Sequence, residues 1–219
     1  MIKVENIDVW GFEHAIRGMR NPLNSWDKSD SKWIYNREIT MPVDNIDIDV
    51  YKYQIGEKDL DLMRRLYKAG TEHRKYLRQI FVSLDITAPL YWWKEMDQYR
   101  INVTTNSCST MHKIAAKEFE LDDFSHDHLT VYSEKCLTET INVLNDYRKS
   151  FVDNTSDKTL WWQMIQLLPS SYNQKRTITM NYENVMNIIH QRENHKLDEW
   201  VELVKIFKEL PYIKNIMEE

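Results

Sequence analysis

Residues 91–113 read YWWKEMDQYRINVTTNSCSTMHK, and they form the most informative stretch of the chain. An aromatic segment is followed by Arg100 and then by a run of short polar side chains. The guanidinium of Arg100 is a planar fork that suits phosphates and carbonyl edges, and Asn106 and Ser109 can bond to the same groups. Because an ordinary polar turn uses the same residue types, the flanking sequence has to decide between a binding loop and a plain turn.

Two flanking segments extend the pattern. Upstream, residues 80–100 read IFVSLDITAPLYWWKEMDQYR, which predicts an apolar strand, an Ala-Pro pair and a helix. Downstream, residues 167–200 read LLPSSYNQKRTITMNYENVMNIIHQRENHKLDEW, which predicts a Leu-Pro stop, a strand and a helix. Three polar residues stand at the start of this helix and along it, six and five positions apart: Asn181, Asn187 and Arg192.

Together these segments resemble the flavin-dependent thymidylate synthases, the ThyX family, over about residues 70 to 210. The hallmark of that family is an R-H-R triplet followed by a loop of the form N-E-x-S-x-R-Y. Here the triplet reads Gln98-Tyr99-Arg100 and the loop runs from Asn106 to His112, with one extra residue between the two halves. The resemblance implies an α+β fold: one ThyX-like domain over residues 1–219, with an antiparallel-rich sheet and long C-terminal helices.

The resemblance also implies roles for individual residues. His73 falls at the position of a flavin-contacting His, counted back from Pro89 without a gap, although a His near a helix end also caps or packs. The implied catalytic residues are Ser109 and Arg192. The implied FAD-binding residues are His73, Arg100, Asn106 and Asn187. The implied substrate-binding residues are Gln98, Ser107, Ser109, Asn181 and Arg192, and no metal ligand is implied.

The family reaction defines the expected cofactors and partners. It passes a hydride from NADPH through FAD toward a pyrimidine nucleotide and takes a one-carbon unit from methylenetetrahydrofolate. The flavin carries the hard chemistry, and the protein mainly orients its ring against the base. The resemblance further implies a homotetramer whose sites are shared between chains.

Much of the family's charge is absent from this chain. Five positions depart from the pattern, four of them at family arginines and one at the loop glutamate: Gln98, Met111, Ile165, Glu183 and Ser107. If only two of the lost arginines contacted the anion, at ~1.5–3 kcal/mol for each charge-assisted bond, affinity would fall roughly 10² to 10⁴-fold. Nearby cations that could compensate are Lys113, Lys175 and Arg176.

Two functions therefore stay open. One is a flavoenzyme of the ThyX type, altered in its substrate. The other is a non-catalytic or repurposed relative that keeps the oligomeric scaffold and a pocket for a different ligand. The sequence contains no G-x-G-x-x-G or Walker A motif, which disfavours a Rossmann or P-loop alternative.

Composition narrows the class of partner. A net charge of -5 over 219 residues argues against a nucleic-acid surface, which needs a basic face. No apolar run reaches the roughly 18 residues of a membrane span, and the N-terminal residues lack the basic-then-apolar order of a signal peptide. Two cysteines are too few for a disulfide scaffold. We therefore expect a cytoplasmic protein.

Two other patterns suggest a metal site and a nucleophilic cysteine, but a structural role is favoured for both. Four residues in LDDFSHDHL look like metal ligands: Asp122, Asp123, His126 and His128. No second ligand pair sits at zinc spacing, so a solvated helix start is favoured. Cys108 could act as a nucleophile only with a depressed pKa, and an inert thiol is favoured.

Periodicity and turn signals give the expected elements. We expect strands over residues 1–10, 43–53, 80–85 and 176–180, and helices over 12–20, 59–69, 133–152, 157–168, 183–192 and 197–210. The helix over 59–69 is expected to end at Gly70 in the left-handed cap position. Residues 72–79 are expected to be helical before the next strand, Thr87 and Pro89 to begin a helix, and residues 24–33 to form a loop. Adjacent tryptophans cannot face one direction on a helix, so one of each pair should meet a neighbouring element or subunit.

Overall fold

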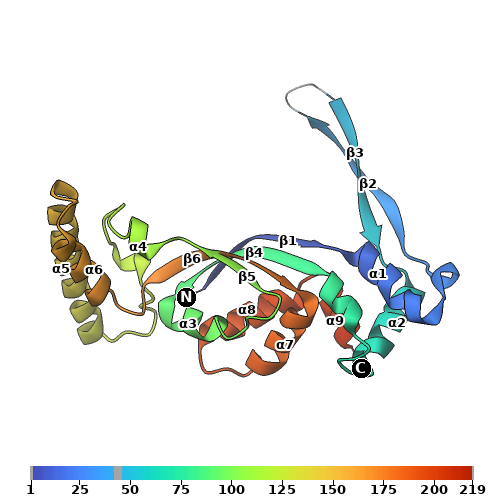
Figure 1. Cartoon of the computed structure of the whole chain (residues 1–219). Helices are drawn as coiled ribbons and strands as arrows, with labels where there is room; N and C mark the ends of the chain where they lie inside the picture. Colours follow the sequence, from blue (N-terminus) through green and yellow to red (C-terminus); the bar gives the residue numbers. More distant parts are fainter. Residues whose placement is uncertain (1, 42–45, 219) are drawn as a thin grey trace. The chain divides into compact units, whose positions relative to one another are not determined.

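The computed structural model describes residues 2–41 and 46–218, without side chains between residues 38 and 48. The chain divides into two compact units (Figure 1). Unit 1 comprises Met1–Ile7, Ser83–Thr179 and Asn194–Leu203, and unit 2 comprises Asp8–Val82, Met180–Glu193 and Val204–Glu219.

A four-stranded sheet with the order β1-β4-β6-β5 organises unit 1. Its strands are β1 (Lys3–Trp10), β4 (Phe81–Pro89), β5 (Thr104–Ser107) and β6 (Asn173–Asn181). Strand β4 buries every second side chain, with Leu84 and Ile86 inside and Asp85 on the other face, as a strand with one covered face should. Strand β5 pairs antiparallel with β6. The mixed α+β architecture and the antiparallel pairing confirm the expected fold class.

Helix α3 (Leu90–Met96) follows β4 directly and brings two tryptophans into the core of unit 1. Trp92 packs on Trp200, with ring centroids 4.7 Å apart, and on Trp93 at 4.8 Å. All three rings are almost fully buried. Trp200 belongs to helix α8 (Asp198–Lys208). The two adjacent tryptophans thus meet different neighbours, because Trp93 donates its indole N–H to the carbonyl of Gln174 at 3.0 Å.

A pair of helices forms the second apolar cluster of unit 1. Helices α5 (Val131–Asp153) and α6 (Lys158–Leu167) begin at the capping side chains of Thr130 and Asp157. Leu137, Ile141 and Leu144 recur on one face of α5 and pack with Met164, which is the spacing of an amphipathic helix. No helix of residues 2–41 and 46–218 combines the length and apolarity needed to cross a bilayer.

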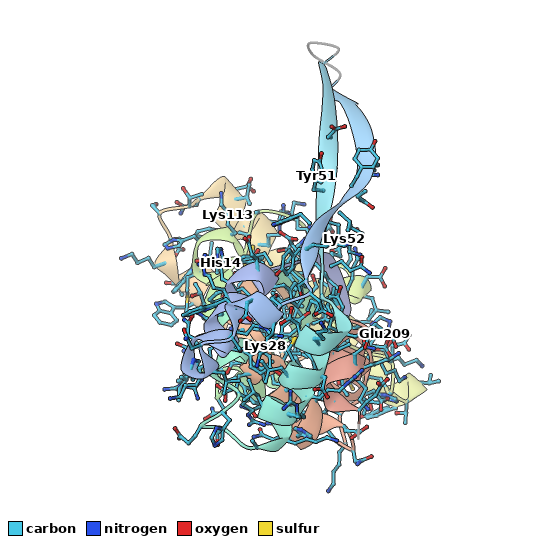
Figure 2. The ribbon with its side chains drawn as sticks, turned by 90° about the vertical axis from the view of Figure 1, so that its right-hand side faces the viewer. His14, Lys28, Tyr51, Lys52, Lys113 and Glu209 are labelled. Atoms are coloured by element: carbon cyan, nitrogen blue, oxygen red, sulfur yellow. The ribbon has the colours of Figure 1, made fainter. Side chains whose placement is uncertain are left out.

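Unit 2 combines helices with a two-stranded hairpin. Its elements are α1 (Phe12–Arg20), β2 (Lys32–Met41), β3 (Ile46–Gln54), α2 (Glu57–Lys68), η3 (Lys75–Gln79), α7 (Tyr182–Arg192) and α9 (Ile213–Met217). Tyr182 is fully buried, packs on Phe12, and donates its hydroxyl to the Pro211 carbonyl. Strands β2 and β3 pair antiparallel into a hairpin that extends away from α1 and α2, with Tyr51 and Lys52 along it (Figure 2).

Asp59 is the polar centre of unit 2. Its carboxylate is fully buried and forms an ion pair with Arg20, itself nearly buried. It also accepts hydrogen bonds from the hydroxyls of Ser29 and Ser31 at 2.7 and 2.6 Å. Burial of the carboxyl would raise the pKa of Asp59, but the bonds from Ser31, Ser29 and Arg20 outweigh burial and lower it. This carboxylate therefore ties α1, α2 and the segment before β2 together.

Several sequence expectations were wrong in detail. Thr87 is not a helix cap but a residue of β4, and Pro89 is the cap position of α3. Residues 72–79 are helical only in part, since the 3-10 helix η3 covers Lys75–Gln79 and residues 72–74 belong to the turn after Gly70. That glycine has φ +104°, the left-handed conformation that glycine tolerates best. Strand β2 was missed, and its first residues fall in the expected loop; residues 43–45 of the expected strand lie outside the described part.

Replacing Asp59 by Asn should destabilise the protein by about 3–5 kcal/mol, because Arg20 would keep a buried charge without its counterion. The folded-state pKa of Asp59 is lowered, so its contribution is present above the unfolded value near pH ~3.9 and is lost as the pH falls below that value. Urea unfolding between pH 3 and 7 measures the difference, which should shrink in acid. Asp61→Asn is the control, because the Asp61–Arg65 pair is exposed and should contribute less than ~1 kcal/mol. Equal losses for both variants would contradict the prediction.

Candidate functional site

The predicted binding loop lies in unit 1, at the edge strand β5 and the short helix α4 (Thr110–Lys113). Asn106 stands opposite Thr177 in the antiparallel ladder, and Ser107 stands opposite Arg176. The hydroxyl of Ser109 accepts the backbone N–H of His112 at 3.2 Å and so caps α4. The strand residues are exposed to solvent. The loop therefore presents its polar groups at the sheet edge, with Ser109 also serving as a helix cap.

Gln98 and Arg100 lie at the end of α3, where both are exposed. Gln98 donates its side-chain amide to the Lys94 carbonyl at 3.3 Å, and Arg100 donates Nε to the Asp97 carbonyl at 3.0 Å. These bonds hold each side chain against its own turn. The other donors of the Arg100 guanidinium point to no residue in the described part of the chain. We call these five residues the loop cluster: Gln98, Arg100, Asn106, Ser107 and Ser109.

Arg176 is the structural anchor behind the loop cluster. It donates Nη1 to Asp97 Oδ1 at 2.8 Å and Nε to Gln174 Oε1 at 2.9 Å. Its guanidinium also lies 4.2 Å from the ring centroid of Trp93, in cation–π geometry. Gln174 in turn donates its amide to the Cys108 carbonyl at 2.8 Å. Through these interactions Arg176 holds α3, β6 and the loop together.

Lys175 is engaged as well, on the polar face of the sheet. Its ammonium lies 3.2 Å from Asp85 Oδ2 and 3.5 Å from Glu5 Oε2. Hydrogen bonds from Thr177 and Asn6, together with Lys175, lower the pKa of Asp85 to about 2. Two of the three cations that could have replaced the missing family arginines therefore have internal partners. Lys113 remains exposed at the end of α4, and no carboxylate of the described part pairs with it.

The second group of predicted residues lies in unit 2, on and around α7. Asn181 caps this helix, since its side-chain oxygen accepts the backbone N–H of Asn184 at 3.0 Å, and it is 2% exposed. One side-chain acceptor of Asn181 is thus used by the fold. Arg192, in the last turn of α7, is half-buried and has a partner of its own.

One face of α7 carries Glu183, Asn187 and His190, spaced by four and three residues, and this face meets the segment from α2 to η3. Glu183 forms ion pairs with Arg74 and Arg78. Further polar contacts join the same segments: Arg74 Nη2 to Asn187 Oδ1 at 3.4 Å, and the Tyr67 hydroxyl to His190 Nε2 at 2.6 Å. We call these six residues the helix cluster: Tyr67, Arg74, Arg78, Glu183, Asn187 and His190.

His73 is exposed and lines a cavity of about 660 Å³ within unit 2. Its lining combines apolar and polar side chains. The apolar ones include Met19, Pro22, Leu23, Leu66 and Tyr76, and the polar ones include Glu72, His73, Lys75, Arg78 and Gln79. A cavity of this size with a few convergent polar groups is typical of small-molecule sites.

The predicted convergence of the two groups stays a prediction. Arg100, Asn106 and Ser109 belong to unit 1, whereas Asn187 and Arg192 belong to unit 2. The recorded contacts of these residues are to other groups, such as their own turn, the strand ladder or a helix cap. Sequence reasoning missed Tyr67, Arg74 and Arg78. The sequence does show two arginines spaced i,i+4 and a glutamate at position 183 that could pair with them.

The residues that resembled metal ligands go to separate partners. His126 lies 2.8 Å from the Phe124 carbonyl through Nδ1, His128 Nε2 lies 2.9 Å from Asp198 Oδ2, and Asp123 pairs with Lys117. Within residues 2–41 and 46–218, no three His, Cys, Asp or Glu side chains gather as a metal site. Cys108 is an exposed free thiol.

These two clusters sit on the fold of the flavin-dependent thymidylate synthases. Two crystal structures of thymidylate synthase X from Helicobacter pylori, both with FAD and dUMP, superpose with TM-scores of 0.68 and 0.67 at 17% and 18% identity. The alignments cover 99% and 98% of this chain and 98% of each solved chain. A UMP/dUMP methylase, PolB from Streptomyces cacaoi, bound with 5-Br UMP, matches with a TM-score of 0.58 at 12% identity, over 95% of this chain and 87% of that one.

The likeness at this identity establishes the fold, and the expectation of a ThyX-like architecture is confirmed. No protein-family model matches the sequence, and no curated protein sequence does either.

Arg176→Lys should destabilise the protein by about 1–3 kcal/mol, because an ammonium cannot make both hydrogen bonds and stack on Trp93. Chemical unfolding measures the loss, and hydrogen exchange should show faster opening of residues 97–109. Lys175→Ala is the matched control at the neighbouring position, since its ammonium is half-exposed and such pairs contribute ~0–1 kcal/mol. A larger loss for Lys175→Ala than for Arg176→Lys would contradict the assignment of Arg176 as the anchor.

Proposed function

We propose that this protein binds FAD and a pyrimidine nucleotide and acts as a flavin-dependent, nucleotide-modifying enzyme of the ThyX type with an altered substrate preference. The observation that carries the proposal is the likeness of fold over nearly the whole chain to proteins solved with FAD and dUMP. The likeness to a methylase of UMP and dUMP supports the same ligand class.

The residues of unit 2 fit a flavin nucleotide. The cavity beside His73 is lined by apolar side chains that could cover a planar ring and by polar side chains that could meet its polar edges. Arg74 Nε is buried and has no hydrogen-bond partner, so a ligand oxygen would satisfy it. Bound FAD would supply hydride transfer, with NADPH as the source and methylenetetrahydrofolate as the one-carbon donor if the reaction is that of the family.

The chain's own residues would bind and orient the ligands. We assign His73, Arg100, Asn106 and Asn187 to the cofactor, because each presents a polar group on a cavity wall, at a strand edge or on a helix face. Gln98, Ser107, Ser109, Asn181 and Arg192 are assigned to the nucleotide. Of these, Ser109 and Arg192 would be the groups nearest the reacting base. A homotetramer with sites shared between chains is part of this proposal.

The altered substrate follows from the missing charge. Met111 replaces a loop arginine and is 54% exposed, Lys175 and Arg176 have internal partners, and Glu183 is neutralised by arginines. A site with these groups holds a nucleotide monophosphate less tightly than one with free arginines. The same observations favour the alternative, a repurposed relative that keeps the scaffold and pocket for another ligand. We further propose a cytoplasmic location, which two free cysteines support.

Purified protein should be yellow and should bind FAD, because the cavity and the partnerless Arg74 Nε favour a flavin nucleotide. Tritium release from labelled dUMP, with FAD, folate and reduced nicotinamide present, should be weak, since a deficit of two charge-assisted bonds weakens binding roughly 10² to 10⁴-fold. Complementation of a thymidine-requiring strain should fail for the same reason.

The controls for this experiment are UMP in place of dUMP and light scattering for the oligomeric state. Colourless protein that binds no added FAD would reject the flavoenzyme in favour of the repurposed scaffold. Robust growth without thymidine would show instead that the nucleotide is held by other groups, Lys113 first among them.

A further inference from the structure

Two arginines of the helix cluster meet one carboxylate on α7, but they do not share it equally. Arg78 grips Glu183 with two prongs, a short Nε contact to one oxygen and Nη2 at 3.3 Å from the other. Arg74 Nε lies 3.6 Å from Glu183 Oε1, beyond hydrogen-bond range. Arg78 therefore makes the closer contact, and Arg74 keeps a longer ion pair with Glu183. Two guanidinium groups share one carboxylate, which leaves a surplus of one positive charge, and the Arg74 side chain is only 17% exposed.

The hydrogen-bonding capacity of Arg74 is also largely unused. A guanidinium has five N–H donors. Within the described residues the Arg74 side chain makes one hydrogen bond, the long contact of 3.4 Å to Asn187 Oδ1. Its Nε is buried without a partner. Native structures rarely leave such a donor unpaired, so this orphaned group indicates an acceptor that binds from outside the chain.

The surrounding side chains hold Arg74 ready for that acceptor. The guanidinium carbon lies 5.5 Å from the ring centroid of Tyr67. The Tyr67 ring is in turn fixed by stacking on His190, with an interplanar angle of 7°, and by its hydroxyl contact to His190 Nε2 at 2.6 Å. Glu183 and Asn187, both on α7, contact Arg74 and restrict the movement of its side chain. A fork fixed in this way loses little rotational freedom on binding.

We propose that Arg74 is a ligand-binding residue that receives a phosphate group of a nucleotide, and that it supplies the positive charge that α7 does not carry at Glu183. The inference rests on the proposed function and deepens it. The chemistry is that of a phosphate ester, which two sources can offer: the diphosphate of FAD or the monophosphate of a pyrimidine nucleotide. Arg78 acts differently, as a positioning residue that holds Glu183 and so keeps it from closing on Arg74.

The alternative is a purely structural network, in which Arg74 only helps to join η3 to α7. The two readings predict different responses to Arg74→Lys. A structural charge is largely preserved by lysine, whereas a two-pronged phosphate contact is not, because an ammonium is a point charge.

The test is calorimetric titration of the full-length protein with FAD, UMP and dUMP separately, for wild type, Arg74→Ala, Arg74→Lys and Arg65→Ala. Arg65 is the matched control, since it is an exposed arginine in a single ion pair on α2. Arg74→Ala should weaken binding of at least one ligand about tenfold to a hundredfold, the loss expected for one charge-assisted contact. Arg74→Lys should recover only part of it, and Arg65→Ala should stay within twofold.

Thermal unfolding of the same samples separates binding from folding. A loss confined to FAD assigns the diphosphate, and a loss confined to UMP and dUMP assigns the monophosphate; both support the proposal. If wild type binds and both Arg74 variants bind within twofold of it, with or without a lower melting temperature, the proposal for Arg74 is wrong and the proposed function stands. If wild type binds none of the three ligands, both are overturned.

Discussion

The alternation of β4 is the constraint on which the rest of the structure depends. Its inward side chains, Val82 to Ala88, are fully buried, while Asp85 faces the polar side. Because the side-chain period of a strand is two, this register cannot slip by one residue without exposing the whole apolar set. The segment that carries Arg74 and Arg78 leads into β4, and α3 with the loop cluster leads out of it. In the chain, β4 thus stands between the segment of Arg74 and Arg78 and the segment of the loop cluster.

The charged side chains in and around the two clusters have different kinds of partner. In unit 1 the cations next to the loop are used by the fold: Arg176 stacks on Trp93 and bonds Asp97, and Lys175 pairs with Asp85. In unit 2 the carboxylate of Glu183 on α7 pairs with two arginines, and one of them, Arg74, has a buried N–H donor without a hydrogen-bond partner. A position that appeared as a loss of charge, Glu183, is therefore part of a rearranged charge pattern.

Local sequence signals were reliable where the chain's own neighbours decide the structure. The left-handed glycine at position 70, just past the end of α2, was in place, because such a turn depends on residues adjacent in the chain. Thr87 failed as a cap because β4 continues past it, and ladder pairing with a covered face outweighs a local preference. Strand β2 was missed because its side chains in the described part are mostly exposed, and its cross-strand aromatic pairs with β3 cannot be seen in its own sequence.

The sequence by itself determined the periodic helices and the fold class. It also showed the two segments that resemble the ThyX family, residues 80–113 and 167–200, since these features follow from residue spacing along the chain. It proposed site residues by family resemblance, but it missed Tyr67, Arg74 and Arg78. Only the tertiary structure decided which charges remain for a ligand, because a charge is free or neutralised according to the groups brought next to it from distant positions. Arg78 and Glu183 are 105 residues apart, and Asp97 and Arg176 are 79 apart. Spacing along the chain carries no record of such pairs, and they are what separates a binding arginine from a structural one.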